Sequence, residues 1–126
     1  MSRKKILLVD DSNTILMMER MILAKHGFEL MTASDGEQAI EKAEKEQPDL
    51  ILLDVVMPRM GGVEALRRLH QNERTSGIPV IMVTTRGEAE NVETAFENGC
   101  SDYVTKPIDS LDLLSKIHSC LGEDRP

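Results

Sequence analysis

The chain has few aromatic residues, few cysteines and no excess of positive charge. Its 126 residues include no tryptophan, one tyrosine and two phenylalanines, so a surface that stacks nucleic-acid bases is not expected. The net charge of -7 also disfavours binding to phosphate backbones, which attract clustered Lys and Arg. Cys100 and Cys120 have neither CxxC spacing nor a histidine companion, which predicts reduced thiols. Direct nucleic-acid binding is therefore not predicted.

Long hydrophobic runs are also absent. No stretch approaches the roughly 18 apolar residues of a membrane span, and the run Ile6–Val9 is too short for a signal peptide. We expect a cytoplasmic protein with no membrane insertion. The length fits one domain, spanning 1–126 with its core at about 4–121. Because the sequence ends soon after the last predicted helix, output is expected to pass through another protein, unless the chain is a fragment of a longer one.

Hydrophobic periodicity predicts five strands that alternate with five helices. The predicted strands are short apolar runs at Ile6–Val9, Phe28–Ala33, Leu50–Leu53, Pro79–Val83 and Ser101–Val104. Central strands that are apolar on both faces indicate a parallel sheet with helices on each side. We therefore predict a doubly wound α/β fold, a (βα)5 sandwich with the flavodoxin-like strand order 2-1-3-4-5.

Acidic residues follow the first and third predicted strands. In such sheets ligands bind beyond the carboxyl ends of the strands, where the strand order reverses, and that point lies between these two strands. Asp10, Asp11 and Asp54 should converge there. Three carboxylates about 6 Å apart would repel by roughly 3 kcal/mol per pair at an effective dielectric of 20, so a cation must compensate. Oxygen-only ligands favour Mg²⁺, or Mn²⁺. Asp11, placed before the first helix, is also a ready N-cap.

A lysine and a threonine complete this set. Lys106, just past the fifth strand, is long enough to reach back as a second positive charge, and Thr84 adds a hydroxyl at the end of the fourth strand. A phosphoryl group fits these residues, with Asp54 as the carboxylate nucleophile and with Thr84, Lys106 and the metal ion binding its oxygens.

The chain resembles the receiver domains of bacterial two-component response regulators, specifically the stand-alone chemotaxis type. The matching segments cover nearly all of it: ILLVDDS, DLILLDVVMPRMGG around Asp54, PVIMVTT ending at Thr84, and SDYVTKP around Lys106. The resemblance implies that Asp10 and Asp11 organise the metal, Asp54 accepts the phosphoryl group, Thr84 binds it and Lys106 pairs with it. It describes a signalling switch, not an enzyme acting on other substrates.

The resemblance also implies features that the residue pattern alone does not give. The backbone carbonyl of Val56 would ligate the metal, and the Lys106–Pro107 peptide bond is often cis. Tyr103 would be a switch residue that turns inward when the Thr84 hydroxyl moves toward phosphate. The implied phosphodonor is a histidine kinase or a histidine phosphotransfer protein. Output to a downstream protein would use the fourth helix, fifth strand and fifth helix.

Two positions depart from the familiar chemotaxis pattern and leave the phosphoryl lifetime open: Val56 replaces an amide side chain and Arg86 an acid. Three other functions fit the sequence less well. A haloacid-dehalogenase-type phosphatase would have a DxDxT motif, which Asp10–Thr14 approaches but with Ser12 at its third position. A flavodoxin would need a glycine-rich phosphate loop in place of the two acids. A receiver that signals by docking alone is disfavoured by the intact site residues.

Overall fold

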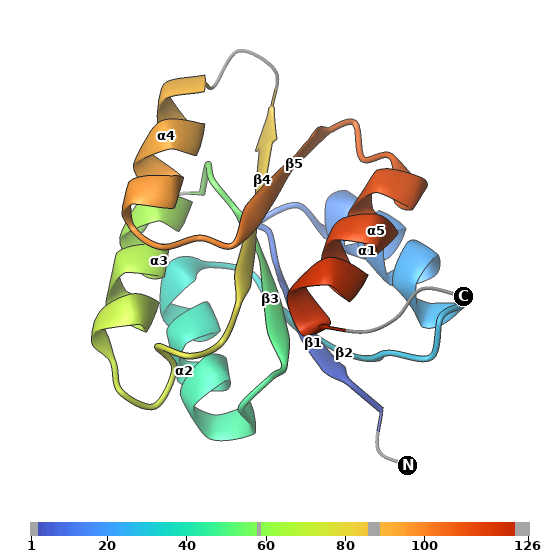
Figure 1. The fold of residues 1–126 in the computed structure, drawn as a ribbon, viewed down its shortest axis with the longest axis horizontal. Coiled ribbons are helices and arrows are strands. Elements are labelled where there is room, and N and C mark those ends of the chain that lie inside the picture. The colour runs from blue at the N-terminus through green and yellow to red at the C-terminus, as the bar shows by residue number, and fades with distance from the viewer. Residues whose placement is uncertain (1–2, 58, 86–88, 123–126) are drawn as a thin grey trace.

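The computed structural model describes residues 3–57, 59–85 and 89–122, with residues 89–91 described by their backbone alone. Strands and helices alternate along this part of the chain, as the periodicity predicted (Figure 1). Their bounds are β1 Lys5–Val9, α1 Asn13–Ala24, β2 Glu29–Ala33, α2 Gly36–Glu46, β3 Leu50–Asp54, α3 Gly62–Gln71, β4 Val80–Thr85, α4 Ala89–Glu97, β5 Asp102–Lys106 and α5 Ser110–Leu121.

The strands form one parallel sheet in the order β2-β1-β3-β4-β5, so the predicted doubly wound topology is confirmed. Helices α2, α3 and α4 cover one face of this sheet, which we call the α2–α4 face. Helices α1 and α5 cover the other, the α1/α5 face (Figure 1). Within the described residues, no helix is both long enough and apolar enough to cross a bilayer.

The sheet divides the apolar core into two clusters. Leu7, Ile51 and Met82 pack on the α2–α4 face, and Leu8, Leu52 and Ile81 pack on the α1/α5 face. Successive residues of a strand point to opposite faces, so a central strand that is covered on both sides is apolar at every position. This is why β3, β1 and β4 read as continuous hydrophobic runs in the sequence.

The ends of several elements differ from the sequence-based expectation by one or two residues. Lys106 is the last residue of β5 and does not lie beyond it, and β4 continues past Val83 to Thr85. Ser12, not Asp11, is the N-cap of α1, because the Ser12 hydroxyl accepts a hydrogen bond from the Ile15 N–H. These shifts place Thr84 and Lys106 within regular strand geometry, so strand alternation fixes the face to which each side chain points.

Candidate functional site

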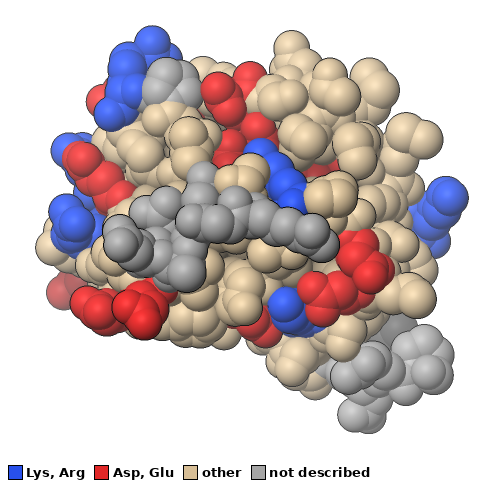
Figure 2. Space-filling model, turned by 90° about the horizontal axis from the view of Figure 1, so that it is seen from above, with Lys and Arg blue, Asp and Glu red and all other residues tan. Residues whose placement is uncertain are grey.

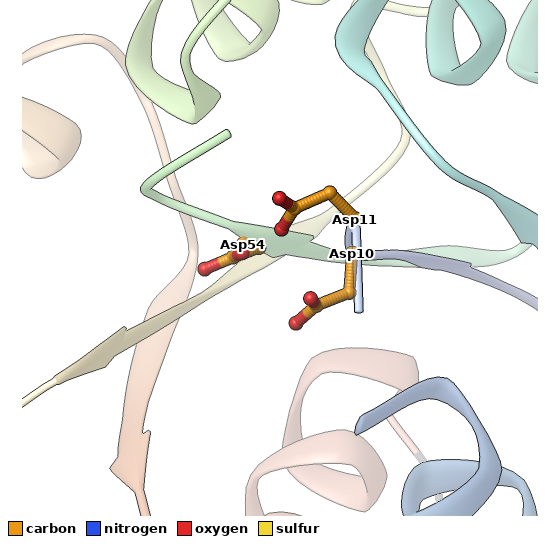
Figure 3. Close-up of side chains that lie close together, drawn as sticks. All are labelled: Asp10, Asp11 and Asp54. Atoms are coloured by element: carbon orange, nitrogen blue, oxygen red, sulfur yellow. The ribbon is translucent and has the colours of Figure 1, made fainter. Parts of the chain in front are cut away.

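Three carboxylates meet where β1 and β3 end side by side. Asp10 and Asp11 follow β1, Asp54 is the last residue of β3, and each offers an oxygen that lies within 4.8 Å of the others. Figure 3 shows the Asp10 and Asp11 side chains pointing to opposite sides of the sheet, Asp10 toward the α1/α5 face. The predicted convergence of these acids from distant parts of the sequence is present in the structure.

Lys106 lies against the two buried acids of this group. Its Nζ is 3.2 Å from Oδ2 of Asp10 and 3.4 Å from Oδ1 of Asp54, and the two aspartates are only 1% and 4% exposed. The alternation of side chains along a strand explains why Lys106 and Asp54 lie on the same face of the sheet. Asp54 and Lys106 have the same parity as Leu52 and Val104, which pack on the α1/α5 face. The Lys106 ammonium therefore neutralises part of the buried negative charge.

Burial and mutual repulsion shift the acid–base properties of these groups. Burial, with the Asp10 charge adding to it, raises the pKa of Asp54 to about 6, while Lys106 works against that shift. For Lys106, burial opposes the charged form, but the carboxylates of Asp54 and Asp10 raise the pKa above its ordinary value. At neutral pH the site thus holds an ionised Asp54 beside a firmly protonated lysine.

The acidic group suits a hard divalent cation. All of its side-chain ligand atoms are carboxylate oxygens, and within the described part of the chain three carboxylates outnumber the one ammonium beside them. Asp11 is exposed, which leaves room for the several waters that Mg²⁺ retains. Seen from above, acidic side chains lie next to a basic one near the middle of the face where the strands end (Figure 2). The residues present therefore fit Mg²⁺ or Mn²⁺.

Thr84 and Tyr103 lie on the other face of the sheet. Thr84 has the parity of Met82, which belongs to the α2–α4 face, and Tyr103 is the register partner of Met82 and packs partly on the same cluster. Thr84 is 1% exposed, and its Oγ1 has no hydrogen-bond partner among the described residues. A buried hydroxyl without a partner costs free energy, so Thr84 is a polar group that the described residues leave unsatisfied.

The loop after Asp54 brings main chain close to that residue. The Val56 N–H donates to Oδ1 of Asp54 at 3.4 Å, and Val56 is 59% exposed. A Cβ at Gly62 would lie 2.1 Å from the Asp54 carbonyl oxygen, so only glycine allows α3 to start this close to the end of β3. The Lys106–Pro107 peptide bond is cis, in line with the resemblance. Arg86 falls outside the described residues.

Glu19 is a buried acid near the site that the sequence analysis did not identify. It is 1% exposed on the core-facing stripe of α1, between Leu16 and Leu23, and its Oε1 has no hydrogen-bond partner among the described residues. Helix side chains lean toward the helix N-terminus, and α1 begins just after Asp11, so Glu19 leans back toward the acids. Burial first, then the charge of Asp10, raises its pKa to about 8.

Comparison with known proteins agrees with this geometry. The family model described as "Response regulator receiver domain" matches residues 6–118. The protein PilH of Pseudomonas aeruginosa is 39% identical over 118 residues, which cover 94% of this chain and 98% of PilH. The structure of the chemotaxis protein CheY4 of Vibrio cholerae superposes with a TM-score of 0.88 at 32% identity, covering 94% of this chain and 99% of CheY4.

Some relatives are about twice as long as the matched segment. PhoP of Bacillus subtilis, an alkaline phosphatase synthesis transcriptional regulatory protein, is 38% identical over 118 residues, but these cover 48% of its length and 94% of this chain. The matched segment is thus found both in chains of this size, such as PilH, and as about half of a longer regulator. With its topology, its acidic group and these matches, the chain belongs to the family of response regulator receiver domains.

Proposed function

We propose that this protein is a phosphorylation-activated switch that accepts a phosphoryl group on Asp54 in the presence of Mg²⁺. The observation that carries the proposal is the placement of Lys106 between Asp10 and Asp54, with the Asp11 carboxylate close by. Three carboxylates beside one ammonium leave an excess of negative charge. A divalent cation offsets this excess, and the pocket can then receive an anionic phosphoryl group.

In the proposed reaction an ionised Asp54 oxygen attacks the phosphorus of a phosphohistidine. The new O–P bond forms as the P–N bond breaks, and the electron pair of that bond returns to the imidazole of the donor. Because the pKa of Asp54 is about 6, this carboxylate is mostly ionised at neutral pH. Asp10, Asp11, Asp54 and the Val56 carbonyl would hold Mg²⁺, whose charge would offset that of the phosphoryl oxygens.

Lys106 and Thr84 act on the same group from opposite faces of the sheet. The Lys106 ammonium already touches Asp54 and would pair with a phosphoryl oxygen bound there. Thr84 brings a buried hydroxyl on the neighbouring strand, and phosphorylation would supply its missing acceptor. Both residues act by positioning and charge neutralisation, the main sources of catalysis in phosphoryl transfer. The protein would catalyse only its own phosphorylation and dephosphorylation.

The signal would leave through α4, β5 and α5. Movement of the Thr84 hydroxyl toward the phosphoryl group would vacate space on the α2–α4 face, into which the Tyr103 ring could turn. The donor would be a histidine kinase or a histidine phosphotransfer protein, and the receiver of the signal another protein. Family membership removes the grounds for the phosphatase and flavodoxin alternatives. Signalling by docking alone is the alternative that the following experiment addresses.

The test is the intact mass of the protein after incubation with acetyl phosphate and Mg²⁺, with rapid quenching. The wild type should gain one phosphoryl group, whereas Asp54→Asn and an EDTA-treated sample should gain none. A matched control is Asp49→Asn, at an acid ahead of β3 at the opposite end of the strand, which should be phosphorylated normally. If no adduct forms with acetyl phosphate, with other small donors or with histidine kinases, the proposal fails and docking alone is favoured.

A further inference from the structure

Tyr103 lies on the outer edge of the sheet, where its main-chain groups must find partners other than a strand. β5 is an edge strand, and among the described strands it pairs with β4 alone. The Tyr103 N–H donates to Oδ1 of Asp102 at 2.8 Å, and the Tyr103 carbonyl accepts from Nζ of Lys116 at 2.7 Å. Both groups point away from β4 and are satisfied by side chains, as the backbone of an edge strand requires.

The Lys116 ammonium also lies over the Tyr103 ring. Its Nζ is 4.9 Å from the ring centroid, within the range of a cation–π interaction, and it forms an ion pair with Asp112 at 3.2 Å one turn earlier on α5. The carbonyl and the carboxylate fix the position of the ammonium. The ring is therefore the partner that can move, since rotation about its χ1 angle leaves the other two contacts of Lys116 intact.

Phe96 holds the ring from α4. The two rings meet edge to face, with centroids 6.0 Å apart and an interplanar angle of 89°. The ring thus bridges α4 and α5 at the sheet edge. Thr84, two residues beyond the register partner of Tyr103, lies on the same face of the neighbouring strand and offers a buried hydroxyl without a partner among the described residues. The contacts at the edge and the hydroxyl toward the interior define two alternative sites for the ring.

We propose that Lys116 is a positioning residue that holds the Tyr103 ring at the sheet edge and so sets the resting balance of the switch. This inference rests on the proposed function, in which the ring turns toward Thr84 after phosphorylation. The cation–π contact exists only with the ring at the edge, so it stabilises the unphosphorylated arrangement. A contact of about 1 kcal/mol corresponds to a change of about fivefold in the ratio of the two ring positions.

The sequence offers a clean probe, because Tyr103 is the single tyrosine of the chain. Labelling with 3-fluorotyrosine gives one ¹⁹F resonance, whose position reports the ring environment in fast exchange. The wild type without and with acetyl phosphate and Mg²⁺ defines the two ends of the scale, and intact mass measures how much protein is phosphorylated. Lys116→Met removes the charge but keeps a side chain of similar length. Lys116→Arg keeps a cation over the ring.

Without phosphodonor, Lys116→Met should move the ¹⁹F resonance toward the position seen in the phosphorylated wild type. The size of the shift should fit a fivefold change in the ratio of the two Tyr103 ring positions. Lys116→Arg should return it toward the resting position. Lys45→Met, at an exposed lysine on α2, should leave it unchanged. If the phosphoryl adduct forms but Lys116→Met stays at the resting position, or Lys116→Arg moves it equally far, the role of Lys116 is refuted and the proposed function stands. A wild type that forms no adduct with acetyl phosphate, with other small donors or with histidine kinases refutes the proposed function itself.

Discussion

The two faces of the sheet carry different polar groups at the same edge. On the α1/α5 face they are charged or titratable: the buried Asp10, Asp54 and Glu19, the last from helix α1, and the half-buried Lys106. On the α2–α4 face they are the buried Thr84 hydroxyl and the half-buried Tyr103 ring, both neutral, beside the exposed Asp11 carboxylate. Asp54 and Thr84 nevertheless belong to neighbouring strands, so a group bound at the strand ends can contact both faces.

Under the proposed function, this difference would separate the residues that carry out phosphoryl transfer from those that report it. The α1/α5 face, which we call the charged face, is electrostatically strained, because among the described residues its buried acids outnumber the one lysine that pairs with them. Among the described residues, the buried groups at this edge of the α2–α4 face carry no charge, because Asp11, which points to that side, is exposed, and the Thr84 hydroxyl there lacks a hydrogen bond; we call this the neutral face. Removing a charge from the first face should therefore change stability strongly and in a pH-dependent way. Removing the hydroxyl from the second should change it little.

Lys106→Met should produce the largest effect. The substitution leaves Asp10 and Asp54 without their counter-charge, which should cost about 3 kcal/mol of unfolding free energy near pH 8. The cost should shrink below pH 6, where Asp54 becomes protonated, given its pKa of about 6. Urea denaturation at pH 8 and pH 5 measures both values, and Lys45→Met serves as the exposed control.

Lys106→Met should also change how strongly the protein binds Mg²⁺. The ammonium occupies carboxylate oxygens that the metal would use, so its removal should strengthen Mg²⁺ binding. The rise in Tm on adding Mg²⁺ should accordingly be larger in Lys106→Met than in the wild type. An equal or smaller rise would mean that Lys106 and the cation do not share ligands.

Glu19→Gln should produce an intermediate effect of opposite sign. The folded-state pKa of Glu19 is raised from 4.5 to about 8, so the folded protein binds more protons than the unfolded chain between those values. The contribution of Glu19 to the wild-type free energy of unfolding is therefore fully present below pH 4.5 and is lost as the pH rises to about 8. The glutamine variant lacks this loss and should be more stable at pH 9 by about 1–3 kcal/mol, allowing for its buried amide.

The measurement is unfolding free energy as a function of pH, with Glu41→Gln on the exposed side of α2 as the matched control. The difference between Glu19→Gln and the wild type should grow from pH 5 to pH 8 and then level off. A difference that is constant across this range would mean that Glu19 is ionised in the folded protein at all of these pH values, against the pKa assigned to it.

Glu19 also marks the limit of what the sequence could predict. The fold followed from runs such as Ile51–Leu53, whose burial on both faces leaves a strong pattern, and the acidic site followed from Asp10 and Asp54 ending neighbouring strands. Glu19 left no such signal, because an acid within a helix is normally solvent-exposed. The N-cap at Ser12 and the contacts of Lys116 with Tyr103 depend on side-chain geometry, which hydrophobic periodicity does not encode.

Thr84→Val should produce the smallest effect on stability and tests the neutral face. Valine has nearly the same shape as threonine, and its methyl group would replace a buried hydroxyl that lacks a partner among the described residues. The variant should be as stable as the wild type or up to about 1 kcal/mol more stable, because no hydrogen bond is lost and an unsatisfied oxygen is removed. Urea denaturation of the unphosphorylated protein measures this difference.

Thr84→Ser, which keeps the hydroxyl and loses the methyl group, should instead be about 1 kcal/mol less stable. A decrease of 2 kcal/mol or more in the free energy of unfolding of Thr84→Val would show that the hydroxyl has a partner in the unphosphorylated protein. The Thr84 hydroxyl would then not be a free donor for a phosphoryl oxygen.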